Sequence, residues 1–94
     1  MKYQDHFAEA LRRARKAKRL TQEDFSSLSS RTYVSILERG IKSPTLNKIN
    51  ELAEVLGVHP LTLLALAYST PKGQATPERL LNQVGRELKA ITAK

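Results

Sequence analysis

Apolar residues recur at intervals of three or four along most of this chain, a spacing that predicts amphipathic helices. In the first such segment, residues 4–18, Phe7, Leu11 and Ala14 form one apolar stripe, and most of the basic side chains lie away from it. No segment has the strict alternation of a half-buried strand. The pattern therefore predicts an all-α protein.

A short second helix is expected to begin at Gln22. Thr21 precedes it as an N-cap, and Phe25 and Leu28 are its apolar anchors. Serines follow at positions 26, 27, 29 and 30, and serine favours caps and turns over helix interiors. The second helix is therefore expected to end early, with a serine at position 29 or 30 capping the next one.

The stretch that follows is predicted to be a third helix, over residues 31–39, which stops at Gly40. Val34, Leu37 and Ile41 fall within about 60° of one another on a helical wheel and are expected to face inward. Glu38 lies about 40° from Val34, so its carboxylate also points toward the core. The outer side is formed by Thr32, Ser35, Ile36 and Arg39. A polar outer side with an arginine, in a basic chain, indicates a helix that reads DNA.

An inward carboxylate is unfavourable unless it is paired, and the first helix offers a cation for Glu38. Arg15 lies about 40° beyond Leu11, at the edge of the first apolar stripe. The two helical wheels therefore predict a structural ion pair between Arg15 and Glu38. A buried pair of this kind fixes orientation more than it adds stability.

Two further helices are expected over residues 46–56 and 60–68. Thr45 caps the first of them and Gly57 ends it, while its inward residues are expected to be Leu46, Ile49, Leu52, Ala53 and Leu56. The second begins at Pro60 and is apolar nearly all round. Such a helix is either central in a fold or shared with a partner, which makes Leu63 and Leu66 candidates for packing or dimer contacts.

The C-terminal part is predicted to be a linker over residues 69–76 and an amphipathic helix over residues 77–94, separate from a domain over 1–68. Thr76 caps this last helix, with Pro77 at its first position. The apolar residues Leu81, Val84, Leu88 and Ile91 recur at spacings of 3, 4 and 3. Such a seam can pack on the same chain or on a second copy.

The charge of the chain favours a polyanionic partner. The formal net charge is +7, and residues 1–42 contain ten Lys or Arg against five Asp or Glu. Residues 43–94 contain six against four, so the positive excess lies in the same half as the third helix. Nucleic acid or an anionic membrane surface fits this balance, and plain solubility is the alternative.

Other features disfavour several classes of function. The chain has no cysteine, which removes disulfides, cysteine catalysis and cysteine-based zinc sites. No apolar run approaches the roughly 20 residues of a membrane span, and no signal-peptide pattern follows the N-terminus. His6 and His59 lack partners at metal-ligand spacing. We therefore expect a cytoplasmic protein that is not an enzyme, with no catalytic residues, metal or cofactor and no membrane partner.

Several motifs in a fixed order now identify a family. The chain contains Leu11-Arg12-Arg13-Ala14-Arg15, Leu20-Thr21-Gln22-Glu23, Ser30-Arg31-Thr32-Tyr33-Val34-Ser35, Leu37-Glu38-Arg39-Gly40, Ser43-Pro44-Thr45-Leu46 and Leu52-Ala53-Glu54-Val55-Leu56-Gly57-Val58. Over residues 7–68 this order and spacing resemble the lambda-repressor-like (Xre/Cro) helix-turn-helix family. The resemblance implies a five-helix DNA-binding domain, here with an additional C-terminal helix. Members usually act as dimers on two-fold-related operators.

The resemblance also assigns roles to individual residues. The reading helix corresponds to residues 31–39, and the implied base contacts are Arg31, Thr32 and Ile36, with Tyr33 nearby. The implied DNA-phosphate contacts are Gln22, Arg39 and Lys42, and we predict that Ser30 and Ser35 contact phosphates as well. The buried arginine–glutamate pair of the family corresponds to Arg15–Glu38, in agreement with the wheels. Arg31 can bind guanine in bidentate fashion, and Ile36 can touch a thymine methyl or belong to the core. Packing on Phe25 is the alternative for Tyr33.

Two of the chain's departures from the family pattern lie before the third helix. The stretch between Gln22 and Arg31 is about two residues shorter than is common, so the second helix or its turn must be trimmed. Arg19 stands where a glycine commonly precedes Leu-Thr-Gln.

We therefore predict a sequence-specific DNA-binding transcriptional regulator, a dimeric repressor or controller, that binds double-stranded DNA at a two-fold symmetric operator. The alternative is an antitoxin-like protein-interaction module that binds DNA for autoregulation and covers a protein partner with its last helix. A non-specific nucleic-acid binder is a third hypothesis. Self-pairing of the seam over residues 81–91 favours the first hypothesis, and a seam left exposed in a purified dimer favours the second.

Overall fold

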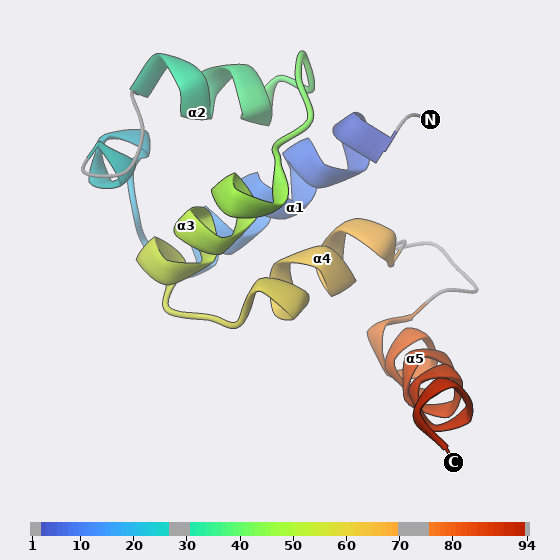
Figure 1. The fold of residues 1–94 in the computed structure, drawn as a ribbon. Helices are drawn as coiled ribbons and strands as arrows, with labels where there is room; N and C mark the ends of the chain where they lie inside the picture. The colour runs from blue at the N-terminus through green and yellow to red at the C-terminus, as the bar shows by residue number, and fades with distance from the viewer. Residues whose placement is uncertain (1–2, 27–30, 70–75, 94) are drawn as a thin grey trace.

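The computed structural model describes residues 3–26, 31–69 and 76–93. Within these ranges it contains five α-helices, one turn of 3-10 helix and no strand. In chain order they are α1 (Tyr3–Ala17), η1 (Gln22–Phe25), α2 (Arg31–Glu38), α3 (Leu46–Leu56), α4 (Pro60–Tyr68) and α5 (Pro77–Thr92) (Figure 1). The predicted all-α fold is confirmed, with a C-terminal helix added to the helical domain.

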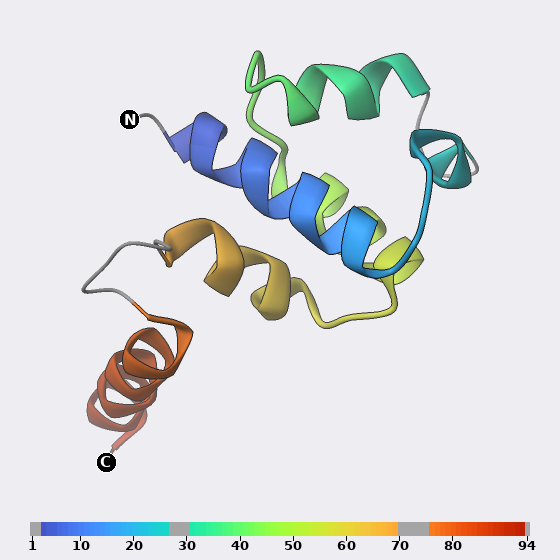
Figure 2. The same ribbon diagram turned by 180° about the vertical axis from the view of Figure 1, so that it is seen from behind.

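Helix α1 is the central element of the bundle. It packs against α2 on one side and α4 on the other, and α3 packs against α4 and η1. Figures 1 and 2, which view the molecule from opposite sides, place α2 at one end of the molecule and α5 at the other. None of the described helices lies over the long side of α2 that faces away from the bundle.

The core is formed by one stripe from each of the first four helices, together with η1. Its buried residues are Phe7, Ala10 and Leu11 of α1, Phe25 of η1, Val34 and Leu37 of α2, Ile49, Leu52 and Leu56 of α3, and Leu63 and Ala67 of α4. These are mainly the positions that the helical spacing predicts as inward. Helix α5 has no buried residue.

The predicted helix boundaries are largely confirmed. The hydroxyl of Thr45 accepts a hydrogen bond from the Lys48 N–H at 3.2 Å, and that of Thr76 accepts one from Arg79 at 3.3 Å. Gly40 and Gly57 follow α2 and α3 with φ of 73°, in the left-handed region that glycine tolerates best. An unpredicted cap is the imidazole of His59, whose Nδ1 accepts from the Leu61 N–H at 3.0 Å at the start of α4.

Two expectations about inward residues are wrong. Ile41 is 54% exposed, because α2 ends at Glu38 and the chain reverses at Gly40, so the helical phase does not extend to it. Leu46 is 74% exposed, because it is the first residue of α3, one turn before the helix meets the core at Ile49.

The segment predicted as the second helix forms 3-10 helix and not α-helix. Residues 22–25 form a single 3-10 turn, in which the Asp24 carboxylate accepts from the Thr21 N–H at 2.6 Å. Phe25 is fully buried and anchors this turn. Leu28, Ser30 and most of the predicted linker lie outside the described residues.

Among the described residues, no single helix is long and apolar enough to cross a membrane. Helices α3 and α4 reach that length and composition only as a pair, and the pair is bent by 106°.

Candidate nucleic-acid interface

The inner side of α2 is held by a bidentate ion pair. The carboxylate of Glu38 accepts hydrogen bonds from Arg15 Nε at 2.6 Å and Arg15 Nη2 at 2.9 Å. Both side chains are largely buried. The hydrogen bonds to Glu38 raise the pKa of Arg15, against the opposing effect of burial. The pair predicted from the two wheels is therefore present, and it joins α1 to the last turn of α2.

Two further side chains extend this cluster. Gln22 Nε2 donates to Glu38 Oε1 at 3.1 Å, which ties the start of η1 to the end of α2. Arg12 Nη2 donates to the backbone carbonyl of Glu38 at 3.3 Å, one of the carbonyls that a helix end leaves without a partner. Arg12, Arg15 and Gln22 thus fix α2 from three positions, and the end of α2 cannot shift without breaking their hydrogen bonds.

The outer side of α2 contains the residues implied as base contacts. Arg31 is the first residue of the helix, Thr32 is exposed, and Ile36 is half-buried. Tyr33 is also half-buried and packs against the core, with Lys48 Nζ 5.5 Å from the centre of its ring. Lys48 in turn pairs with Glu51 at 3.0 Å. Tyr33 therefore has a packing role that connects α2 to α3.

The residues implied as phosphate contacts lie in different settings. Lys42 is exposed after the end of α2, and Ser35 is half-buried within it. Arg39 is exposed, and its Nε donates to the Ser35 carbonyl at 3.3 Å, so this guanidinium lies along its own helix. The amide of Gln22 has one hydrogen bond to Glu38 and a second N–H to offer. Ser30 lies outside the described residues.

The role of Arg12 and the Gln22–Glu38 contact were not predicted from the sequence. Arg12 precedes Arg15 by three residues and therefore lies on the same side of α1. This spacing is visible in the sequence and could have indicated that Arg12 also reaches α2. The contact of Gln22 with Glu38 depends on how η1 packs against α2. No residue spacing in the sequence predicts that packing.

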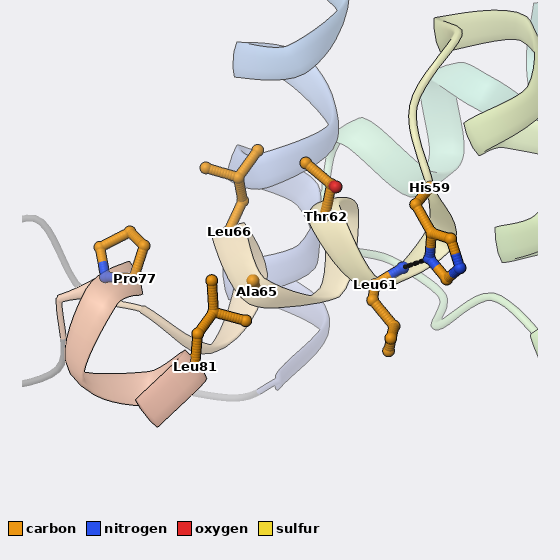
Figure 3. Close-up of a pocket in the computed structure, with 7 residues that line it drawn as sticks. All are labelled: His59, Leu61, Thr62, Ala65, Leu66, Pro77 and Leu81. Atoms are coloured by element: carbon orange, nitrogen blue, oxygen red, sulfur yellow. Dashed lines mark hydrogen bonds between the residues drawn. The ribbon is translucent and has the colours of Figure 1, made fainter. Parts of the chain in front are cut away.

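The predicted seam of α5 forms an exposed apolar stripe. Leu88 is 54% exposed and Ile91 is 78% exposed, while Val84 is half-buried. Pro77 and Leu81 line an apolar groove of about 340 Å³ together with Ala65 and Leu66 of α4 (Figure 3). Leu63, by contrast, is fully buried within its own chain, so its role is packing.

Within the described ranges, no three His, Asp or Glu side chains lie close enough together to hold a metal ion.

Comparison with known proteins identifies the protein family of this helical domain. A helix-turn-helix family model matches residues 11–63, a range that contains the Arg15–Glu38 pair and the whole of α2. The chain belongs to the lambda-repressor-like helix-turn-helix family, a class of DNA-binding transcription regulators.

One relative illustrates this class. An uncharacterized HTH-type transcriptional regulator of Sinorhizobium fredii, y4dJ, is 43% identical to this chain over 63 residues. The matched part is 65% of this chain and 82% of that protein. No solved structure matches the chain.

The buried pair leads to a prediction about stability. The substitution Glu38→Ala leaves the guanidinium of Arg15 buried without its partner, and we expect a loss of about 3–5 kcal/mol in the free energy of unfolding. Urea denaturation followed by circular dichroism measures this change. The matched control is Glu54→Ala, which removes the same charge from an exposed position of α3 and should cost within about 0.5 kcal/mol. Equal effects of the two substitutions would contradict a structural role for the pair.

Proposed function

We propose that this protein is a sequence-specific regulator of transcription that inserts α2 into the major groove of double-stranded DNA. The observation that supports this most directly is the difference between the two sides of α2. Its inner side is fixed by Val34, Leu37 and Glu38, and its outer side has the exposed Thr32 and none of the described helices over it. An α-helix fits the major groove, where each base pair presents a distinct pattern of donors, acceptors and methyl groups.

In this proposal the N-terminal half of α2 chooses the sequence. Arg31 binds a guanine through its O6 and N7, and Thr32 contacts the neighbouring base. Tyr33 adds a contact at the edge of the site, and Ile36 touches a thymine methyl. The phosphate contacts, which set position and not sequence, are made by Gln22, Ser30, Ser35, Arg39 and Lys42.

The basic half of the chain supplies affinity. Ten Lys or Arg stand against five Asp or Glu in residues 1–42, and lysine and arginine that neutralise phosphates release condensed counterions. Arg12 and Arg15 donate hydrogen bonds to Glu38 within the chain. The other exposed lysines and arginines are therefore the ones available to DNA.

We also propose that the regulator is a homodimer joined through α5. A 16-residue helix with no buried residue is marginal alone in water, whereas two copies that pair along Leu81, Val84, Leu88 and Ile91 would bury their stripes. Because α5 lies at the opposite end of the molecule from α2, such pairing leaves α2 uncovered. A two-fold dimer would present its two reading helices to major grooves about 34 Å apart on a symmetric operator.

A dimer bound over a promoter blocks access to that DNA, so we propose a repressor or controller that acts in the cytoplasm. The exposed stripe of α5 also supports a second candidate, an antitoxin-like module whose stripe binds a different protein and whose DNA binding serves autoregulation. The two candidates differ in whether a purified dimer covers the stripe.

The proposed base contact of Arg31 can be tested once selection from a random duplex library has supplied the preferred site. Arg31→Ala should weaken binding to that site by about 1–3 kcal/mol and relax the choice at one base pair, because the bidentate contact is lost. Fluorescence anisotropy measures the change. Arg86→Ala, which removes the same charge from α5, is the control and should have little effect. An equal loss on preferred and unrelated duplexes would assign Arg31 to a phosphate.

The proposed dimer can be tested by sedimentation at micromolar concentration. The wild-type chain should sediment as a dimer, and Leu88→Lys should sediment as a monomer, because a charge cannot be buried in the stripe. Leu46→Lys changes an equally apolar and more exposed residue outside α5, and this control should remain a dimer. A monomeric wild type, or a dimer that survives Leu88→Lys, would contradict pairing through α5.

A further inference from the structure

Three helices of this chain end in the same backbone motif. After α2, the N–H of Gly40 bonds to the carbonyl of Leu37 and that of Ile41 to Ile36, and α3 ends in the same way at Gly57 and Val58. This is the Schellman motif, whose central residue adopts the left-handed conformation and is usually glycine. Both Gly40 and Gly57 have φ of 73°.

The first of the three motifs differs in one respect. After α1, the N–H of Arg19 bonds to Lys16 at 3.0 Å and that of Leu20 to Arg15 at 3.0 Å, so Arg19 occupies the position that glycine has in the other two. Its φ is 57°, and it is the single non-glycine residue with positive φ in the described part of the chain. A residue with a Cβ is disfavoured there relative to glycine. The chain therefore has an arginine at the position where the ends of α2 and α3 have glycine.

The surrounding structure holds this turn in place. Arg15 Nη1 donates to the carbonyl of Leu20 at 3.0 Å, while the same guanidinium binds Glu38 of α2. The residue that follows Arg19 is thus tied to α2 through the guanidinium of Arg15. Backbone strain that the surroundings enforce in this way is concentrated at functional sites.

The side chain of Arg19 is free for an external partner. It is exposed, and no described residue forms a hydrogen bond or ion pair with its guanidinium. Arg12, Arg15 and Arg39, in contrast, each donate to a carbonyl or carboxylate of the chain. Arg19 therefore has a fixed backbone, a strained conformation and a charge that the fold itself does not use.

We propose that Arg19 is a DNA-backbone contact, in which its guanidinium binds a phosphate beside the groove that α2 enters. The contact rests on the proposed function and adds a residue to it. A guanidinium suits this role because its planar array of N–H donors matches the oxygens of a phosphate. The anchored turn presents it from a fixed point, so less freedom is lost on binding than from a mobile loop.

The test compares two substitutions by thermal unfolding and by DNA binding at several salt concentrations. Arg19→Gly removes both the strain and the charge, so the melting temperature should rise by about 4 °C or more. Affinity should fall about three- to tenfold on preferred and unrelated duplexes alike, and the slope of log K against log salt should become shallower by about 0.9. Arg19→Lys keeps the charge and the strain, so its affinity should stay within about threefold of wild type and its slope should not change.

Arg86→Ala is again the charge-matched control and should leave the slope unchanged. If Arg19→Gly has the same affinity and salt slope as wild type, the phosphate contact is overturned. If Arg19→Gly lowers the melting temperature, the backbone strain at Arg19 is overturned, and with it the argument for the contact. A phosphate contact acts on any duplex and does not require sequence preference. A wild-type protein that binds all duplexes equally would therefore contradict the proposed sequence-specific function but not the contact of Arg19. A wild type that binds no DNA would overturn both.

Discussion

The orientation of α2 depends on one buried ion pair. Glu38 stands near the end of a helix of only eight residues, and Arg15 reaches it from the central helix with two hydrogen bonds. Arg12 and Gln22 bind the same residue, so α1, η1 and α2 meet at Glu38. A short helix with two buried apolar side chains has little else to fix its tilt. The cluster therefore connects the fold to the proposed function, because base contacts require a helix held at one angle.

The parts of the fold that follow local rules could be predicted from the sequence. The stripe of α1, the ends at Gly40 and Gly57 and the caps at Thr45 and Thr76 depend on spacing and on side chains within a few residues. The Arg15–Glu38 pair could also be anticipated, because two wheels fix which sides of the two helices face each other. Where a wheel was extended past the end of its helix, as at Ile41, or to its first residue, as at Leu46, the expectation was wrong.

Contacts that depend on how elements cross could not be predicted in the same way. The bond from Gln22 to Glu38 and the placement of Lys48 over Tyr33 require the packing of η1 and α3 against α2. Arg19 shows a different limit. The departure from glycine is visible in the sequence, but its meaning depends on a left-handed backbone that only the structure reveals. The residues that touch bases depend in addition on how the whole domain docks on DNA.

An NMR titration of the labelled protein with its selected duplex shows whether the outer side of α2 meets DNA. We expect the largest amide shift changes in α2 and in the adjoining residues around Gln22 and Lys42, and little change in the amides of α5 in the proposed dimer. Changes concentrated in α5 or in the groove between α4 and α5, with α2 unaffected, would contradict this expectation.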